Sequence, residues 1–136
     1  PRTRSTNAQG DRNLTNPNNY RAIRFADVLL MAAEAFNKKS SPDDAKALTY
    51  PNRVRTRAFG NTSNNINSSG STLYENILNE RRVELVGEGH RFFDLVRTGK
   101  AAQEINGFVV GKHELFPIPA IEIQLAGNRW SQNPNY

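Results

Sequence analysis

Residues 79–97 contain the side chains best suited to chemistry, because nine of these nineteen residues are ionisable. Glu80, Glu84 and Glu88 recur every four positions, so a continuous helix would place all three carboxylates on one face. Paired carboxylates can act as the acid and the base in glycoside hydrolysis. Such an acid needs an open cleft, whereas every acid in this stretch has an arginine within four positions. We therefore predict ion pairs that stabilise the fold, and no catalytic residue.

The expected ion pairs involve arginine more than lysine, since thirteen of the eighteen cationic residues are arginine. The guanidinium group forms fixed, forked hydrogen bonds with a carboxylate, which offsets the cost of burying charge. Helical spacing predicts that Arg91 pairs with Glu88 and Asp94, and that Asp94 also pairs with Arg97. The predicted ion-pair signature comprises Arg53, Arg55, Arg57, Glu80, Arg81, Arg82, Glu84, Glu88, Arg91, Asp94 and Arg97.

Other kinds of functional site lack their sequence signals. The chain has no cysteine and two histidines, His90 and His113, without a ligand-spaced pair, so we predict no metal site. It has no glycine-rich phosphate loop and no nucleophile motif, and we predict no cofactor. The net charge of +5 is compatible with nucleic-acid binding, but the arginines are interleaved with acids and form no basic run. No apolar run approaches the ~20 residues that span a bilayer.

Helices are expected to position the charged stretch, because apolar residues recur at helical spacing along most of the chain. Ser41 followed by Pro42 predicts the N-cap and the first residue of a second helix. Gly87 and Gly89 predict the end of a third helix or a bend in it, and Gly99 predicts the C-terminal cap of a fourth. The expected helices cover about residues 20–38, 41–57, 72–86, 90–98 and 119–124.

The first two expected helices form a hairpin that resembles one tetratricopeptide repeat, with small and aromatic residues at Ala33, Ala45 and Phe36. Pro51 is expected to kink the second helix. We expect a short strand or an extended segment at residues 108–110. The predicted fold class is all-α, with this hairpin, further helices, long loops and an extended C-terminal tail.

Four segments follow, in order, the motifs of a known family. Residues 24–35 read Arg-x-Ala-Asp-x-Leu-Leu-x-x-Ala-Glu-Ala, and residues 52–58 read Asn-x-Val-Arg-x-Arg-Ala. Residues 80–99 contain Glu-Arg-Arg-x-Glu-Leu, Glu-Gly-x-Arg and Asp-Leu-x-Arg-x-Gly. Leu-Phe-Pro-Ile-Pro at residues 115–119 precedes Gln-Asn-Pro-Asn-Tyr at residues 132–136. Together these motifs resemble the C-terminal portion of the SusD/RagB family, outer-membrane nutrient-binding lipoproteins of Bacteroidetes.

The resemblance implies that residues 20–136 form a C-terminal helical domain, after an extended or disordered lead-in at residues 1–19. It implies a binding protein and not an enzyme, held at the outer-membrane surface of a Gram-negative cell by an N-terminal lipid anchor outside this chain. Members of the family deliver an oligosaccharide or a peptide to a SusC-type TonB-dependent transporter. Their ligand site is formed mainly by regions N-terminal to this portion, so no family ligand residue is carried onto this chain.

Trp130 is the one side chain that we consider for ligand binding, as an aromatic platform beside polar groups. A tryptophan in such a tail more often pins the tail to the core. An alternative function is a tetratricopeptide-like scaffold that binds a protein partner without a small-molecule ligand. A glycoside-active enzyme is a weaker alternative, which an accessible carboxylate pair without an arginine partner would support.

Overall fold

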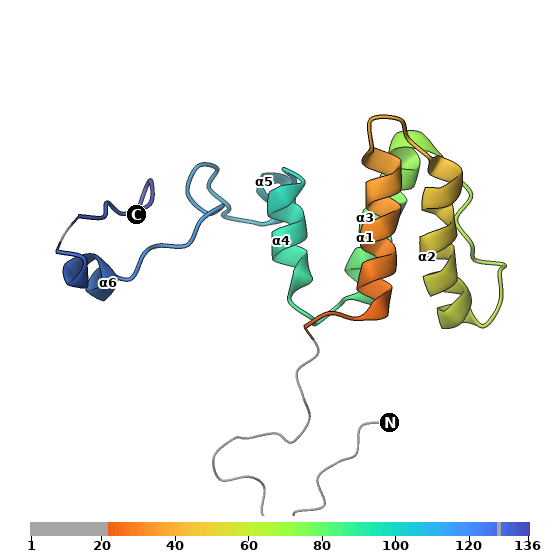
Figure 1. Cartoon of the computed structure of the whole chain (residues 1–136), viewed down its shortest axis with the longest axis horizontal. Coiled ribbons are helices and arrows are strands. Elements are labelled where there is room, and N and C mark those ends of the chain that lie inside the picture. The colour runs from red at the N-terminus through yellow and green to blue at the C-terminus, as the bar shows by residue number, and fades with distance from the viewer. Residues whose placement is uncertain (1–21, 128) are drawn as a thin grey trace, which may run out of the picture. The chain divides into compact units, whose positions relative to one another are not determined.

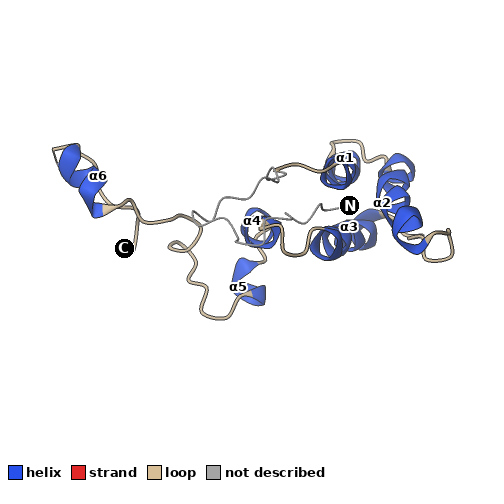
Figure 2. Ribbon diagram, turned by 90° about the horizontal axis from the view of Figure 1, so that it is seen from below, coloured by secondary structure: helices blue, strands red, loops and turns tan. Residues whose placement is uncertain are grey.

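The computed structural model describes residues 22–127 and 129–136, which form helices and loops without a strand (Figure 1, Figure 2). The all-α fold class expected from the sequence is confirmed. Contacts divide the chain into two units, Pro1–Gly70 and Ser71–Tyr136. The lead-in predicted at residues 1–19 lies outside the described residues. The described helices are α1 (Phe25–Lys38), α2 (Asp44–Phe59), α3 (Gly70–Glu84), α4 (His90–Arg97), α5 (Ala101–Glu104) and α6 (Ala120–Leu125).

Helices α1 and α2 lie side by side as an antiparallel hairpin in the first unit (Figure 1). Leu29, Leu30 and Val54 form its buried core, and Ala26 and Tyr50 pack against them. The apolar residues of α1 recur at helical spacing, so they share the face that α2 covers. Burial of this face holds the two helices together.

The small and aromatic residues of the hairpin differ in one position from the prediction. Ala33 is fully buried, as expected, but the fully buried alanine of α2 is Ala47, whereas Ala45 is exposed. The ring of Phe36 stacks on that of Tyr50, with 5.7 Å between ring centroids. The hairpin thus combines small buried residues with one aromatic pair, as in a tetratricopeptide-like arrangement.

Helix α2 begins two residues later than predicted. Asp43, and not Ser41, is the N-cap, and its carboxylate accepts a hydrogen bond of 3.0 Å from the backbone N–H of Lys46. Pro51 is buried inside the helix and does not end it. The helix ends at Gly60, whose φ of 72° is left-handed and therefore favours glycine.

The asparagine-rich segment after α2 runs back along that helix and is attached to it by side chains (Figure 1). The Asn52 amide donates to the Ile66 carbonyl at 3.0 Å and accepts from the Ile66 N–H at 2.7 Å. Nearer the turn, the Arg55 Nε donates to the carbonyl of Asn64. Polar side chains on α2 therefore replace the backbone partners that an irregular segment lacks.

The far end of this segment is attached at Asp44. One Asp44 oxygen accepts from the Asn37 amide at 2.8 Å, and the other accepts from the Gly70 N–H. Asn37 also donates to the Gly70 carbonyl at 3.1 Å. Gly70 is the first residue of α3, so this helix begins two residues before the predicted Thr72.

In the second unit, the third helix ends where the glycines predict. Helix α3 stops at Glu84, and Gly87 and Gly89 adopt φ values of 78° and 83°. Glu88 lies in the turn between them. The prediction that Glu88 continues the face of Glu80 and Glu84 is therefore wrong, because left-handed backbone interrupts the helix before it.

Helix α4 ends in the glycine cap predicted at Gly99, which has a φ of 71°. The Gly99 N–H donates to the Val96 carbonyl at 3.1 Å, and the Lys100 N–H donates to the Leu95 carbonyl at 2.9 Å. This pair of bonds is a Schellman motif, which satisfies carbonyls that the helix end would otherwise leave open. The reversal brings the short helix α5 against α4.

The C-terminal tail binds to the segment that precedes α6. Gln132 accepts from the Ile118 N–H at 2.7 Å and donates to the Ile118 carbonyl at 2.8 Å. Asn133 donates to the carbonyl of Phe116 at 2.7 Å. The Leu-Phe-Pro-Ile-Pro and Gln-Asn-Pro-Asn-Tyr motifs are thus in direct contact.

Aromatic contacts connect α4 to the same segment. The Phe92 ring lies 6.5 Å from that of Phe108 and 6.0 Å from that of Phe116, measured between centroids. Residues 108–110 form no strand. The Val109 N–H instead donates to Nδ1 of His113 at 2.9 Å, which closes a turn.

Candidate functional site

Asp94 lies between two arginines in the charged stretch. Its Oδ2 accepts a hydrogen bond of 3.0 Å from Nε of Arg81 on α3. Its Oδ1 accepts from Nε and Nη2 of Arg97, one turn further along α4, at 2.9 and 2.7 Å. The carboxylate therefore joins α3 to α4 through one long-range pair and one local pair.

The two ion pairs of Asp94 differ in burial. Asp94 is 8% exposed and Arg81 is 5% exposed, whereas the Arg97 side chain is 43% exposed. Every fully buried side-chain nitrogen and oxygen among the described residues has a hydrogen-bond partner. With both its oxygens bound by cations, Asp94 is poorly placed to exchange a proton with a substrate. The arrangement is that of a structural connection between helices.

Arg91 departs from the pairing expected from helical spacing. Its Nη2 lies 3.2 Å from Oε2 of Glu104 on α5, whereas the spacing predicted Glu88 and Asp94. The turn at Gly99 brings α5 back against α4 and so supplies a carboxylate from outside the helix. Both side chains are partly exposed, at 39% for Arg91 and 48% for Glu104.

The predicted acids on α3 differ in burial. Glu80 is 7% exposed, and Glu84 and Glu88 are of intermediate exposure. Each of the three makes a polar or charged contact within the chain. The carboxylate series is therefore engaged by the fold and does not form an open acidic surface.

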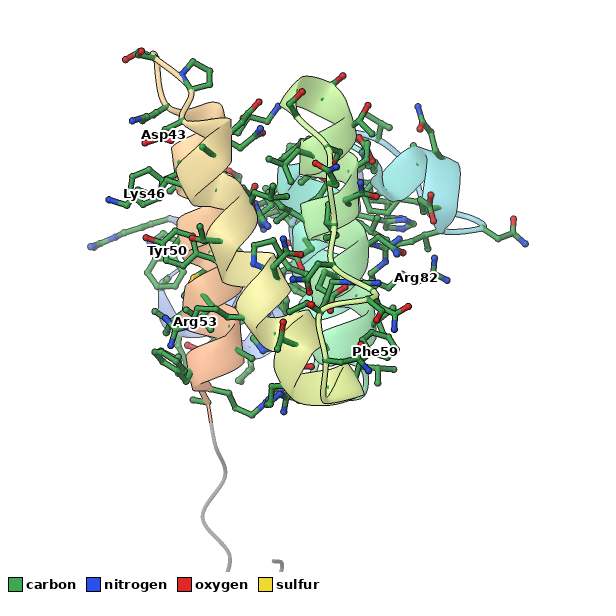
Figure 3. The ribbon with its side chains drawn as sticks, turned by 90° about the vertical axis from the view of Figure 1, so that its right-hand side faces the viewer. Asp43, Lys46, Tyr50, Arg53, Phe59 and Arg82 are labelled. Carbon is green, nitrogen blue, oxygen red and sulfur yellow. The ribbon has the colours of Figure 1, made fainter. Side chains whose placement is uncertain are left out.

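The predicted arginines of α2 contact rings and the adjoining loop. The Arg53 guanidinium lies over the Phe25 ring, 5.5 Å from its centroid, and Figure 3 shows Arg53 on the same side of α2 as Tyr50. Arg55 lies 5.3 Å from the centroid of Phe59, in addition to its bond with the loop. Arg57 also has a contact within the chain. These contacts add cation–π attraction at the surface of the hairpin.

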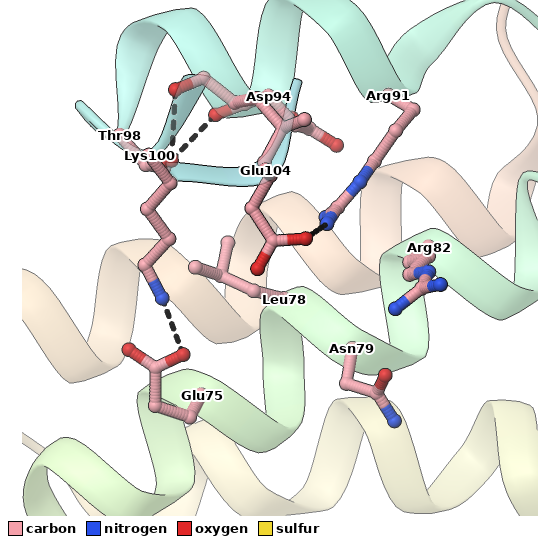
Figure 4. Close-up of a pocket in the computed structure, with 10 residues that line it drawn as sticks. Glu75, Leu78, Asn79, Arg82, Arg91, Asp94, Thr98, Lys100 and Glu104 are labelled. Atoms are coloured by element: carbon pink, nitrogen blue, oxygen red, sulfur yellow. Dashed lines mark hydrogen bonds and ion pairs between the residues drawn. The ribbon is translucent and has the colours of Figure 1, made fainter. Parts of the chain in front are cut away.

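A small charged recess is present beside α3 (Figure 4). Its volume is about 120 Å³, well below the ~300 Å³ at which small-molecule pockets begin. Lys100 forms an ion pair with Glu75 at its edge. The recess is lined by Glu75, Leu78, Asn79, Arg82, Arg91, Asp94, Leu95, Thr98, Lys100 and Glu104.

Trp130 is 55% exposed, so its ring is open to solvent and does not pin the tail. The tail is held instead by the amide side chains of Gln132 and Asn133. Across the described residues, no group of three histidine, cysteine or acidic side chains is arranged to hold a metal ion. None of the described helices combines the length and the apolar character needed to cross a membrane.

Comparison with known proteins places the chain in a family. The model of the SusD family matches residues 2–115. The chain belongs to the SusD family. The matched residues include the motifs at residues 24–35, 52–58 and 80–99, which resemble those of SusD/RagB proteins.

Individual SusD-like proteins give the same result. The chain is 35% identical over 133 residues to SusD-like protein P2 of Formosa agariphila, which covers 87% of this chain and 26% of that protein. It is 37% identical over 84 residues to a SusD-like protein of Bacteroides ovatus, covering 61% of this chain and 14% of the relative. A crystal structure of a SusD homolog from Bacteroides thetaiotaomicron matches 84% of this chain and 26% of that one, with 36% identity and a TM-score of 0.68. The chain therefore spans about a quarter or less of the length of these relatives.

Three charged residues around the recess of this SusD-family chain were absent from the predicted signature, namely Glu75, Lys100 and Glu104. Glu75 and Lys100, which pair with each other, are 25 residues apart in the sequence, and Glu104 is 13 residues from its partner Arg91. Helical periodicity detects neighbours three or four residues apart, so it carries no signal for either pair. The turn at Gly99 was visible in the sequence, but the carboxylate that it brings to Arg91 was not.

Proposed function

We propose that the intact protein binds a nutrient at the outer-membrane surface and passes it to a SusC-type TonB-dependent transporter. The ligand would be an oligosaccharide or a peptide, and the protein would act by capture and delivery without bond chemistry or a cofactor. The match to the SusD family over residues 2–115 is the observation that carries this proposal.

In this proposal, residues 20–136 are the C-terminal structural part of the protein, preceded by the lead-in at residues 1–19. An N-terminal lipid anchor outside this chain would attach the protein to the membrane. The ion-pair signature would stabilise this part, and regions N-terminal to it would supply most of the ligand site. The engaged Asp94 and the small volume of the recess support a structural role for the charged stretch.

Affinity purification of the intact, tagged protein from detergent-solubilised outer membrane tests the partner. Mass spectrometry of the eluate, compared with that from untagged cells, should identify a TonB-dependent barrel at near-equal abundance. Recovery of a soluble protein with no barrel would contradict the transport proposal and favour the tetratricopeptide-like scaffold.

Glycan and peptide screening of the same preparation tests the ligand class. Substitution of Trp130 then tests whether this residue belongs to the ligand site. If its exposed ring contacts the ligand, Trp130→Ala should weaken binding by ~0.5–1.5 kcal/mol, a typical value for an aromatic contact. Trp130→Phe keeps an aromatic ring and should retain most of the affinity. Equal affinity of the wild type and Trp130→Ala would exclude Trp130 from the ligand site.

A further inference from the structure

The recess beside α3 contains a cation that has no partner within the described part of the chain. Arg82 is exposed and lines the recess. It takes part in no hydrogen bond, ion pair or ring contact among the described residues, unlike Lys100 and Arg91 in the same recess. An exposed guanidinium with five donors in a fixed fork is a good partner for an oxyanion.

The neighbouring cation, Arg91, forms a weak ion pair with Glu104, which would compete with an external anion. Its pair with Glu104 has a separation of 3.2 Å, and both side chains are more than a third exposed. Exposed pairs of this kind contribute little to stability, because water screens them and ordering two long side chains is unfavourable. Arg91 can therefore exchange Glu104 for another anion at little cost.

The other carboxylates of the recess do not compensate Arg82. Glu75 pairs with Lys100, and the two oxygens of Asp94 accept bonds from arginines outside the recess. Asn79 lies three residues before Arg82 on α3 and lines the same recess (Figure 4). The donors without a strong acceptor thus lie on the side of the recess where α3 carries Arg82.

The volume of the recess restricts what could occupy it. About 120 Å³ is several times the ~10–15 Å³ that one water molecule needs on this measure. That space fits a carboxylate or a sulfate group and is too small for a saccharide chain. The rest of an acidic ligand would have to extend out of the recess.

We propose that Arg82 and Arg91 bind the carboxylate or sulfate group of a small acidic ligand in this recess. Each guanidinium can form two parallel hydrogen bonds with such a group, which gives charge-assisted binding with defined orientation. Asn79, on the same helix as Arg82, also lines the recess. This inference depends on the recess alone and does not require the proposed transport function.

Calorimetric titration of the intact protein with sodium sulfate, glucuronate and glucose, at an ionic strength held constant with chloride, tests the proposal. Sulfate and glucuronate should bind saturably and glucose should not, since glucose lacks the anionic group. Arg82→Gln should weaken binding of both anions by about tenfold or more, the effect expected for loss of a charge-assisted bond. Arg129→Gln, which changes an exposed arginine that does not line the recess, should leave binding unchanged.

Glu104→Gln provides a variant with the opposite expected effect. It removes the carboxylate that competes for Arg91, so both anions should bind several-fold more tightly. Thermal melting of each variant establishes that it is folded. Absence of saturable binding in both the wild type and Glu104→Gln, or equal affinity in the wild type and Arg82→Gln, would overturn the proposal.

Discussion

Replacing Asp94 with asparagine should destabilise the protein by about 3 kcal/mol. Removing one partner of a buried ion pair typically costs ~3–5 kcal/mol, and both Asp94 and Arg81 are more than nine-tenths buried. The lower end applies because the asparagine oxygen can still accept one hydrogen bond and Arg81 has a further contact in the chain. The second pair of Asp94, with the 43% exposed Arg97, contributes at most about 1 kcal/mol.

Urea unfolding of the intact protein, followed by circular dichroism, measures the free energy of unfolding for each variant. Hydrogen exchange of the α4 amides then shows whether the loss is concentrated in that helix. Arg97→Gln and Glu104→Gln serve as controls, and each should cost no more than about 1 kcal/mol because its pair is exposed. If Asp94→Asn costs no more than these two variants, the buried pair is not what connects α3 to α4.

Three other substitutions test the polar contacts and the glycine cap. Asn52→Ala removes both bonds to the Ile66 backbone, so the loop should open more easily by ~1–3 kcal/mol, measured as faster hydrogen exchange of the Ile66 amide. Gly99→Ala places a side chain in left-handed backbone, and no atom lies close to the new Cβ, so the cost is purely conformational. This cost of ~1–2 kcal/mol should lower the melting temperature, and Gly99→Asn should lower it less. Gln132→Ala breaks both bonds to Ile118 and should speed proteolysis of the tail, while unchanged cleavage would show that the tail is held elsewhere.

Local sequence features predicted most of the helical framework. Periodic apolar residues indicated the hairpin, and the glycines at positions 87, 89 and 99 marked a break and a cap that the structure contains. These features act within one turn of backbone, so their effect can be read from adjacent residues. The N-cap of α2 was misplaced because Ser41 and Asp43 are both good caps, and only the backbone geometry selects between them.

The pairing of the charged residues was less predictable. Spacing identified Asp94 with Arg97, but the buried partner of Asp94 is Arg81, thirteen residues earlier on another helix. Whether Arg91 pairs with Asp94 or with Glu104 depends on where α5 packs, and a periodic pattern in the sequence does not predict that position. The residue types therefore predicted that ion pairs would form, whereas the fold decided which of them are buried.

The loop that follows α2 has a tip with local contacts only and a later part that is bonded to α2. From Asn64 onward it is bonded to α2 at several points as far as Gly70, whereas the exposed residues 60–63 at its tip make only local contacts with neighbouring residues. Residues added at the tip would leave those bonds in register, while a single residue inserted after Asn64 would shift the later bonds, at Ile66 and Gly70. Residues 61–63 are accordingly the place to insert an epitope or a fluorophore.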